Sequence, residues 1–160
     1  MFNIIPITSE RQTDCGATCL QMLLQYYNIE VDLNTLIKEC NTSITGCSAK
    51  DILNAARKYG LNEAKAYNIT PDSLVIQDRP AIIWWLYHHF VVFCGQDENG
   101  KIVICNPDSG RYRLSYDTFK SFYCGIAITN GEAQDLPQTE EATVADYQQA
   151  LIDLGVKINE

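Results

Sequence analysis

The stretch Gln12–Leu24 reads Gln-Thr-Asp-Cys-Gly-Ala-Thr-Cys-Leu-Gln-Met-Leu-Leu and marks a change from a polar loop to an apolar helix. The apolar residues that recur at helical spacing after Cys15 are Ala17, Cys19, Leu20, Leu23, Leu24 and Tyr27. We therefore expect Cys15 in the first turn of a buried helix, with Asp14 or Thr13 as its N-cap. Free amide hydrogens and the helix dipole stabilise a thiolate at such a position. Gly16 leaves room for a substrate backbone beside the sulfur. A lone cysteine here would be better explained as a small apolar residue that opens a core helix.

Length, composition and charge limit the class of protein. The chain has 160 residues, 46% of them hydrophobic and 20% charged, which is typical of one soluble globular domain. Its net charge of -8 argues against nucleic acid or an anionic membrane as the main partner. No apolar run reaches the roughly 20 residues of a membrane helix, and the first residues lack the basic start of a signal peptide.

The cysteines point to a reducing compartment. The chain has seven, an odd number, several of them inside apolar segments and none in a Cys-x-x-Cys pair. We therefore expect reduced cysteines and a cytoplasmic location. Cys15 and Cys19 could bind a metal together with one of the histidines, but the two adjacent histidines lack zinc-like spacing. We expect no metal and no cofactor.

The order of helical and strand patterns predicts an α+β fold. Asp32 is expected to cap a second helix, Ser48 and Asp51 to form a capping box on a third, and Gly60 to end it. Strands are expected at 64–69, 81–87, 90–94, 102–105, 111–114 and 123–129, with a loop at 70–78, a hairpin turn at 97–100 and a short helix after Ser115. An N-terminal helical half would thus pack on an antiparallel β-sheet half.

Three parts are expected along the chain. Residues 1–130 form the main domain, 131–143 an acidic linker, and 144–155 a C-terminal amphipathic helix. The apolar face of that last helix could cover the domain, a second subunit or a partner protein.

A thiol hydrolase needs a base beside its cysteine and a group that orients the base. The chain has only two histidines, His88 and His89, and on a strand adjacent residues point to opposite faces. Periodicity alone does not choose between them. The 97–100 hairpin returns Asn106 to the level of this pair, and Asp108 is a charged rival two residues later.

An oxyanion hole would complete such a site. The backbone N–H of Cys15, at the start of the helix, can supply one hydrogen-bond donor. The preceding loop offers two candidates for the second donor, Gln12 and Ser9.

These pieces together resemble the papain-like cysteine peptidases that process bacteriocins, the double-glycine leader peptidases. The resemblance runs over residues 5–129 in the same order. The matching motifs are Asp14-Cys-Gly-Ala-Thr-Cys-Leu-Gln-Met, Tyr26-Tyr27, Gly46-Cys-Ser48, Ala55-Ala56 through Gly60-Leu61, Pro80-Ala-Ile-Ile-Trp-Trp, His89-Phe-Val-Val, Asn106-Pro-Asp-Ser-Gly110 and Tyr123-Cys-Gly-Ile-Ala.

The resemblance implies a papain-like fold and a role for each site residue. It implies that Cys15 is the nucleophile and that His89, just before Phe-Val-Val, is the base. Asn106 stands where the family has an Asp. Ser9 stands where the family's oxyanion Gln usually lies, six residues before the cysteine, whereas Gln12 is three residues before it.

The resemblance also implies a substrate and a setting. The substrate would be a leader peptide cut after its Gly-Gly end, and the partner a peptide-export transporter at the inner face of the membrane. In the transporters, membrane helices follow the peptidase domain, whereas an acidic linker and a short helix follow here. We therefore expect a free-standing peptidase, or a relative recruited to another task, rather than a transporter fragment.

We thus predict a cysteine peptidase in which Cys15, His89 and Asn106 form a triad. One alternative is a leader- or peptide-binding module with weakened catalysis on the same fold. Another is a thiol-dependent amidase or transpeptidase that uses the same Cys15 and His89.

Overall fold

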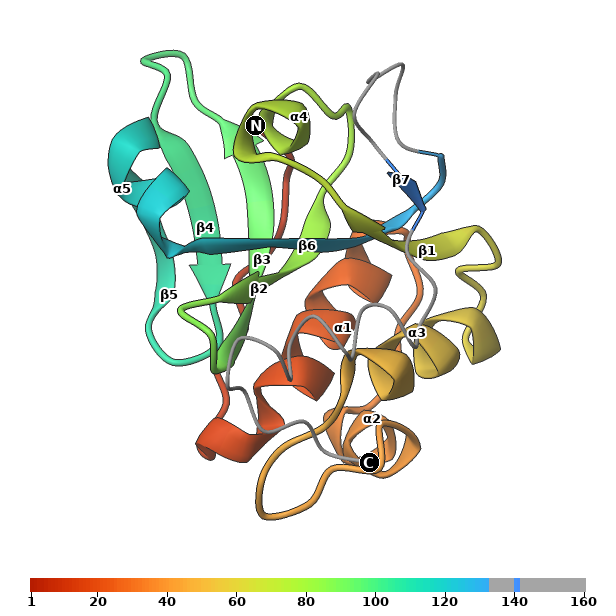
Figure 1. The fold of residues 1–160 in the computed structure, drawn as a ribbon. Helices are drawn as coiled ribbons and strands as arrows, with labels where there is room; N and C mark the ends of the chain where they lie inside the picture. Colours follow the sequence, from red (N-terminus) through yellow and green to blue (C-terminus); the bar gives the residue numbers. More distant parts are fainter. Residues whose placement is uncertain (133–139, 142–160) are drawn as a thin grey trace.

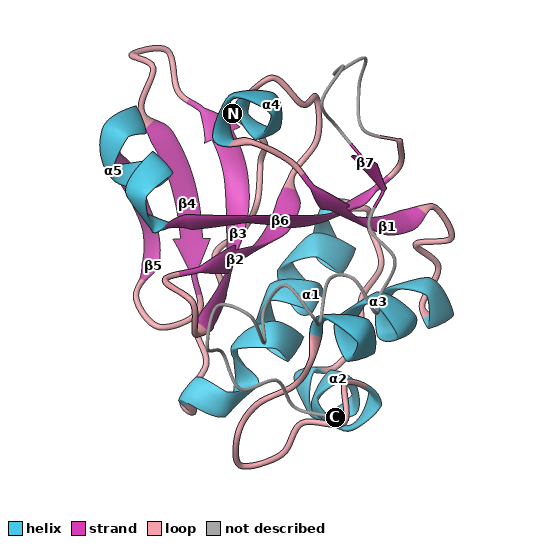
Figure 2. Cartoon of the chain, in the orientation of Figure 1, coloured by secondary structure: helices cyan, strands magenta, loops and turns pink. Residues whose placement is uncertain are grey.

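The computed structural model describes residues 1–132 together with the strand residues 140–141, and it has the α+β architecture expected from the sequence. A helical half built from the first part of the chain packs against an antiparallel sheet, with two short helices beyond it (Figures 1 and 2). The sheet has the strand order β5-β4-β3-β2-β6-β1-β7.

Local capping signals fix the helical half. A short 3-10 helix, η1 (Gln12–Asp14), leads into α1 (Cys15–Tyr26), which is followed by α2 (Leu33–Glu39) and α3 (Ala49–Lys58). The expected Asp32 cap and the Ser48–Asp51 capping box are both present. Gly60 adopts the expected left-handed conformation, with φ of 113°.

The side-chain N-cap predicted for α1 is absent. Asp14 stands at the N-cap position, but its side chain accepts no hydrogen bond from the helix. Its Oδ2 instead accepts a hydrogen bond from Arg11 Nε at 3.0 Å. In the preceding 3-10 turn the backbone N–H of Cys15 already donates to the carbonyl oxygen of Gln12. The helix α1 therefore begins without a side-chain cap.

The second half of the chain supplies the strands and two short helices. The strands are β1 (Ala64–Asn68), β2 (Ala81–Trp85), β3 (His89–Gln96), β4 (Ile102–Asn106), β5 (Gly110–Leu114), β6 (Tyr123–Asn130) and β7 (Glu140–Glu141). The loop expected at 70–78 contains the helix α4 (Pro71–Val75), because Thr70 caps it and a proline fits its first turn. The helix expected after Ser115 is α5 (Tyr116–Phe122).

Two apolar clusters lie on the two faces of the sheet. On one face α1, α2 and α3 pack against Phe90, Val92 and Cys94 of β3. On the other face Leu74 of α4 and Phe119 of α5 pack against a cluster that includes Val91 and Phe93. The alternation along β3 thus places successive side chains in different cores.

The turn between β2 and β3 has an unusual backbone. Leu86 and Tyr87 both have positive φ, 54° and 63°, and His88 N–H donates to the carbonyl oxygen of Trp85 at 3.2 Å. Bulky residues rarely adopt this conformation. Two further bonds hold it: Leu86 N–H donates to the Phe122 carbonyl, and Tyr87 N–H donates to a cysteine sulfur.

The expected linker and C-terminal helix fall largely outside the described residues. Within the segment 131–143, Glu140 and Glu141 pair with Asn68 and Tyr67 of β1. The helix predicted at 144–155 lies outside the described part of the chain. None of the described helices combines the length and the apolar character needed to cross a membrane.

Candidate active site

Cys15 lies at the first residue of α1, where the sequence placed it, and is almost completely buried, with 8% of its surface exposed. Burial is the largest influence on its thiol, followed by a hydrogen bond from the Phe90 backbone amide, which stabilises the thiolate. Burial outweighs the hydrogen bonds, and the pKa of Cys15 rises from 9.0 to about 11. The amides at the helix start thus lower the pKa as expected, but burial, which the sequence did not reveal, has the larger effect.

The hydrogen bond from Phe90 brings Cys15 next to the histidine pair along the chain. His89 is the first residue of β3 and is 3% exposed, whereas His88 belongs to the β2–β3 turn and is exposed. The alternation argument fails for His88, because this residue is not on a strand. Burial therefore distinguishes the two histidines where periodicity does not.

Asn106 lies directly against His89. Its Oδ1 is 2.8 Å from His89 Nε2, across the pair of neighbouring strands β3 and β4. The β3–β4 hairpin brings the last residue of β4 back to the first residue of β3, as the Asn-Gly turn predicted.

The hydrogen bonds of Asn106 decide the tautomer of His89. The backbone N–H of Asp108 also donates to Asn106 Oδ1, at 2.8 Å. A backbone N–H can only donate, so the atom that faces it is the amide oxygen. His89 Nε2 must then carry its hydrogen and donate to this oxygen, and in the neutral ring Nδ1 is the basic nitrogen.

His89 Nδ1 is buried and has no hydrogen-bond partner among the described residues. An unpaired buried acceptor is costly, and such atoms occur at catalytic sites. An imidazole nitrogen without a partner among the described residues thus belongs to the residue next to Phe90, whose amide contacts the sulfur of Cys15.

Asp108, the charged rival of Asn106, also approaches the imidazole. Its Oδ2 is 3.5 Å from His89 Nε2, and its side chain is 43% exposed. Asn106 is therefore the closer hydrogen-bond partner, and Asp108 adds a negative charge beside the same nitrogen. The ring of His88 stacks on that of His89 with 6.1 Å between centroids.

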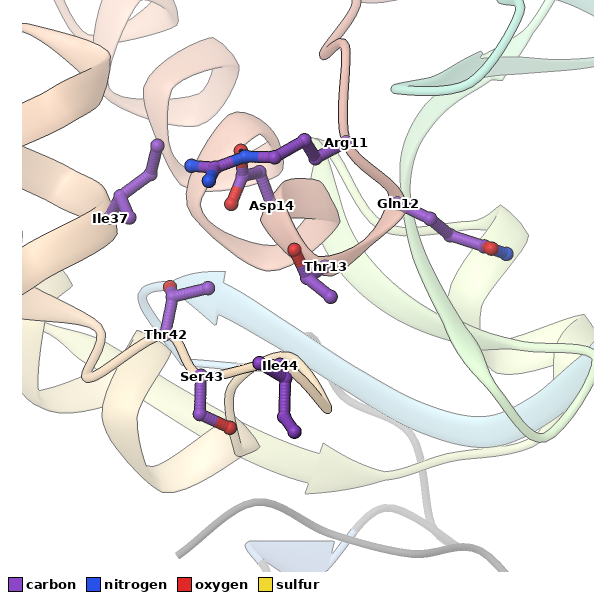
Figure 3. Close-up of a pocket in the computed structure, with 8 residues that line it drawn as sticks. All are labelled: Arg11, Gln12, Thr13, Asp14, Ile37, Thr42, Ser43 and Ile44. Atoms are coloured by element: carbon purple, nitrogen blue, oxygen red, sulfur yellow. The ribbon is translucent and has the colours of Figure 1, made fainter.

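The loop before Cys15 carries the two candidate oxyanion donors. Ser9 donates its hydroxyl to the carbonyl of Arg11 at 3.2 Å, and its backbone N–H donates to the carbonyl of Pro107 at 2.9 Å. Ser9 thus ties this loop to the turn after Asn106. Gln12 is exposed, and in Figure 3 its side chain points away from Asp14.

Gly16 has a packing role that the sequence did not reveal. A Cβ at this position would collide with Cys47 Sγ and would lie 2.9 Å from Cδ1 of Ile52 in α3. The glycine therefore permits the close approach of α1 and α3.

A hollow of about 720 Å³ opens beside the start of α1 (Figure 3). Arg11, Thr13 and Asp14 line one side, and Ile37 of α2 with the loop 42–44 lines the other. Neither Cys15 nor His89 is among the residues that line it, so the hollow lies beside the candidate site and not within it. Among the residues that the structure describes, no group of three His, Cys, Asp or Glu side chains could hold a metal ion.

The chain matches the model of the peptidase C39 family over residues 4–135. It is 27% identical over 156 residues to the probable microcin-H47 secretion/processing ATP-binding protein MchF of Escherichia coli, covering 97% of this chain and 21% of that protein. It is 26% identical over 128 residues to the lactococcin-G-processing and transport ATP-binding protein LagD of Lactococcus lactis subsp. lactis, covering 76% of this chain and 18% of that protein. The chain thus spans about a fifth of the length of these relatives.

Solved structures share its fold. A double glycine motif protease from an AMS/PCAT transporter, crystallised with its leader peptide, has a TM-score of 0.74 at 32% identity, covering 79% of this chain and 90% of that one. The peptidase domain of Streptococcus ComA, a bifunctional ABC transporter of a quorum-sensing pathway, has a TM-score of 0.70 at 21% identity, covering 81% of this chain and all of that one. At this lower identity the similarity concerns the fold alone.

Proposed function

Because the chain belongs to the peptidase C39 family of cysteine peptidases, we propose that it cleaves a leader peptide after a Gly-Gly end, with Cys15, His89 and Asn106 as its catalytic triad. The observation that carries the proposal is the hydrogen bond from His89 Nε2 to Asn106 Oδ1. This bond leaves Nδ1 as a buried base without a partner among the described residues. It also holds the ring beside the backbone segment that contacts the sulfur of Cys15.

The raised pKa of Cys15 determines when the proton moves. At about 11 the thiol is neutral at pH 7, so proton transfer accompanies attack and does not precede it. His89 Nδ1 accepts the thiol proton while the sulfur bonds to the peptide carbonyl carbon. The imidazolium then returns this proton to the leaving amine, the C–N bond breaks, and water, deprotonated by His89, hydrolyses the thioester.

The developing oxyanion needs hydrogen-bond donors. The backbone N–H of Cys15 is one of them in this proposal, and it must turn from the carbonyl oxygen of Gln12, to which it donates in the free chain, toward the oxyanion. We assign the second to Gln12, because its side chain is exposed, whereas the Ser9 hydroxyl already donates within the loop.

The substrate class follows from the relatives. The family member crystallised with a leader peptide is a double glycine motif protease, and the microcin and lactococcin relatives are named for processing as well as secretion. We infer a peptide substrate that carries such a leader, and a peptide-export transporter at the inner face of the membrane as a partner. The hollow beside α1 offers room for a segment of this peptide.

A cleavage assay with matched histidine variants tests the proposal. Synthetic peptides that join a leader ending in Gly-Gly to a short cargo are incubated with the full chain, and the products are identified by mass spectrometry. We expect cleavage after the second glycine, loss of more than about 10³-fold with Cys15→Ser, and a similarly large loss with His89→Gln. The exposed neighbour provides the control, and His88→Gln should retain activity within about threefold.

Other outcomes would support the alternatives. Binding of the leader without cleavage by the intact chain would favour a peptide-binding module. Transfer of the leader to an added amine in preference to water would favour a transpeptidase. Undiminished cleavage by Cys15→Ser would contradict the proposal in all its forms.

A further inference from the structure

We propose that Asp108 supplies the negative charge that Asn106 lacks. Asn106 would then orient the ring of His89, and Asp108 would balance the positive charge of its protonated form. Asn106 fixes the tautomer of the ring, and Asp108 stabilises the imidazolium that forms when His89 takes the proton. Asp108 acts on the reaction only through His89 and is therefore a positioning residue. The inference rests on the proposed role of His89 as the base.

The geometry of the β4–β5 turn carries the proposal. Asp108 Oδ2 lies 3.5 Å from His89 Nε2, while Asn106 Oδ1 lies 2.8 Å from the same atom. The Asp108 backbone amide donates to Asn106 Oδ1, so the main chain of one residue holds the side chain of the other. The Ser9 amide fastens the same turn to the loop before Cys15 through the carbonyl of Pro107.

The difference in charge between an amide and a carboxylate explains why one residue fixes the tautomer and another balances the imidazolium charge. An amide oxygen accepts the Nε2 hydrogen and selects the tautomer, but it carries no charge to balance an imidazolium. A carboxylate 3.5 Å away provides that charge by Coulomb attraction without taking over the hydrogen bond. Its partial exposure screens the attraction, so the effect is moderate.

Two titratable side chains lie against His89, namely Asp108 of the β4–β5 turn and His88 of the β2–β3 turn. The thiol of Cys15 in α1 accepts a hydrogen bond from Phe90, the residue after His89. Of these groups, Asp108 is the one with a carboxylate. Its charge also raises the pKa of the Cys15 thiol, so it opposes the thiolate while it favours the imidazolium.

A double-mutant cycle tests this division. Asp108→Asn keeps the backbone amide and the shape of the side chain but removes the charge. We expect kcat for the leader peptide to fall about tenfold with KM little changed, since Asn106 still fixes the tautomer. In the Asn106→Asp background, which places a carboxylate at the closer position, Asp108→Asn should cost less than about twofold. Asp108→Glu should retain most of the activity.

A second readout separates charge from mere structure and needs no catalysis. The loss of a negative charge near the sulfur should shift the pH dependence of Cys15 alkylation to lower pH in Asp108→Asn, although catalysis becomes slower. A damaged turn would not produce these two effects with opposite signs.

Two results would overturn the inference. One is an equal loss of kcat from Asp108→Asn in both backgrounds, which would mean that Asp108 only shapes the turn. The other is an unchanged kcat and an unchanged alkylation profile in a chain that cleaves its peptide normally, in which case the proposed triad stands without Asp108. Failure of the proposed function itself would be seen separately, as absence of cleavage by the unmodified chain.

Discussion

Opposing influences act on the sulfur of Cys15, and burial is the stronger. The Phe90 and Gly16 amides stabilise a thiolate, whereas removal from water and the nearby Asp108 and Asp14 charges favour the thiol. Sequence reasoning predicted amide donors at the start of the helix, such as that of Gly16, but not the amide of Phe90, which belongs to β3. It could not find the burial, because that depends on which strands cover the helix in the folded chain.

Alkylation of Cys15 tests this balance directly. With a pKa of about 11, roughly one molecule in 10,000 carries the thiolate at pH 7, so reaction with iodoacetamide should be slow and should rise about tenfold per pH unit up to pH 10. The other six thiols are separated by peptide mapping with mass spectrometry.

The variant His89→Gln serves as the control for this measurement. With the pKa of the Cys15 thiol raised by burial, alkylation does not depend on His89, so the variant should show the same alkylation profile. Rapid reaction near pH 6 that disappears in His89→Gln would instead demonstrate a thiolate–imidazolium pair.

At the scale of elements, the residues with strictly local signals were the most predictable. Asp32, Ser48 and Gly60 each act on backbone groups within a few positions, and each does what its residue type suggests. Thr70 carried the same kind of signal ahead of Pro71, and its helix could have been predicted from that pair.

The β2–β3 turn could not be predicted in this way. Leu86 and Tyr87 have no local preference for positive φ, and the turn is held by bonds to Phe122 and Cys124, which lie far along the chain. The same distant contacts exclude His88 from the strand and leave His89 at its first position.

The contact between α1 and α3 leads to a prediction about stability. Gly16→Ala should lower the free energy of unfolding by about 1–3 kcal/mol, because its Cβ would press on Cys47 and on Ile52. Urea denaturation followed by circular dichroism measures the loss. Removing one obstacle in Gly16→Ala/Cys47→Ala should restore part of it, relative to Cys47→Ala alone. A fully stable Gly16→Ala that fails to cleave peptide would return Gly16 to the role of clearing space for substrate.

For the whole molecule, the α+β division was predictable because helical and strand periodicities occupy separate halves of the chain. The assembly of the site was only partly predictable from the sequence. The hairpin signal brought Asn106 to the histidines, but the choice of His89, the tautomer and the approach of Asp108 all depend on how turns from different elements meet.

The buried thiols link the stability of the whole molecule to pH. Burial raises the pKa of Cys15 and of Cys19, whereas a hydrogen bond to a neighbouring thiol, together with burial, raises the pKa values of Cys47 and Cys94. Above pH 9 the unfolded chain loses these protons while the folded chain keeps them, so stability is full below pH 9 and falls as pH rises. Cys105, whose pKa is lowered to about 7 by its hydrogen bond from Cys94, acts in the opposite sense, but only between pH 7 and 9.

Each retained proton should steepen the loss by roughly 1.4 kcal/mol per pH unit. We therefore expect the free energy of unfolding, measured in urea from pH 7 to 10.5, to decline steeply above pH 9. Cys15→Ser removes one titrating group. Its free energy of unfolding should therefore decline less steeply, by roughly 1.4 kcal/mol per pH unit, whatever its stability at pH 7. Parallel slopes for the two proteins above pH 9 would mean that the Cys15 thiol ionises equally in the folded and unfolded chains, and that burial does not control it.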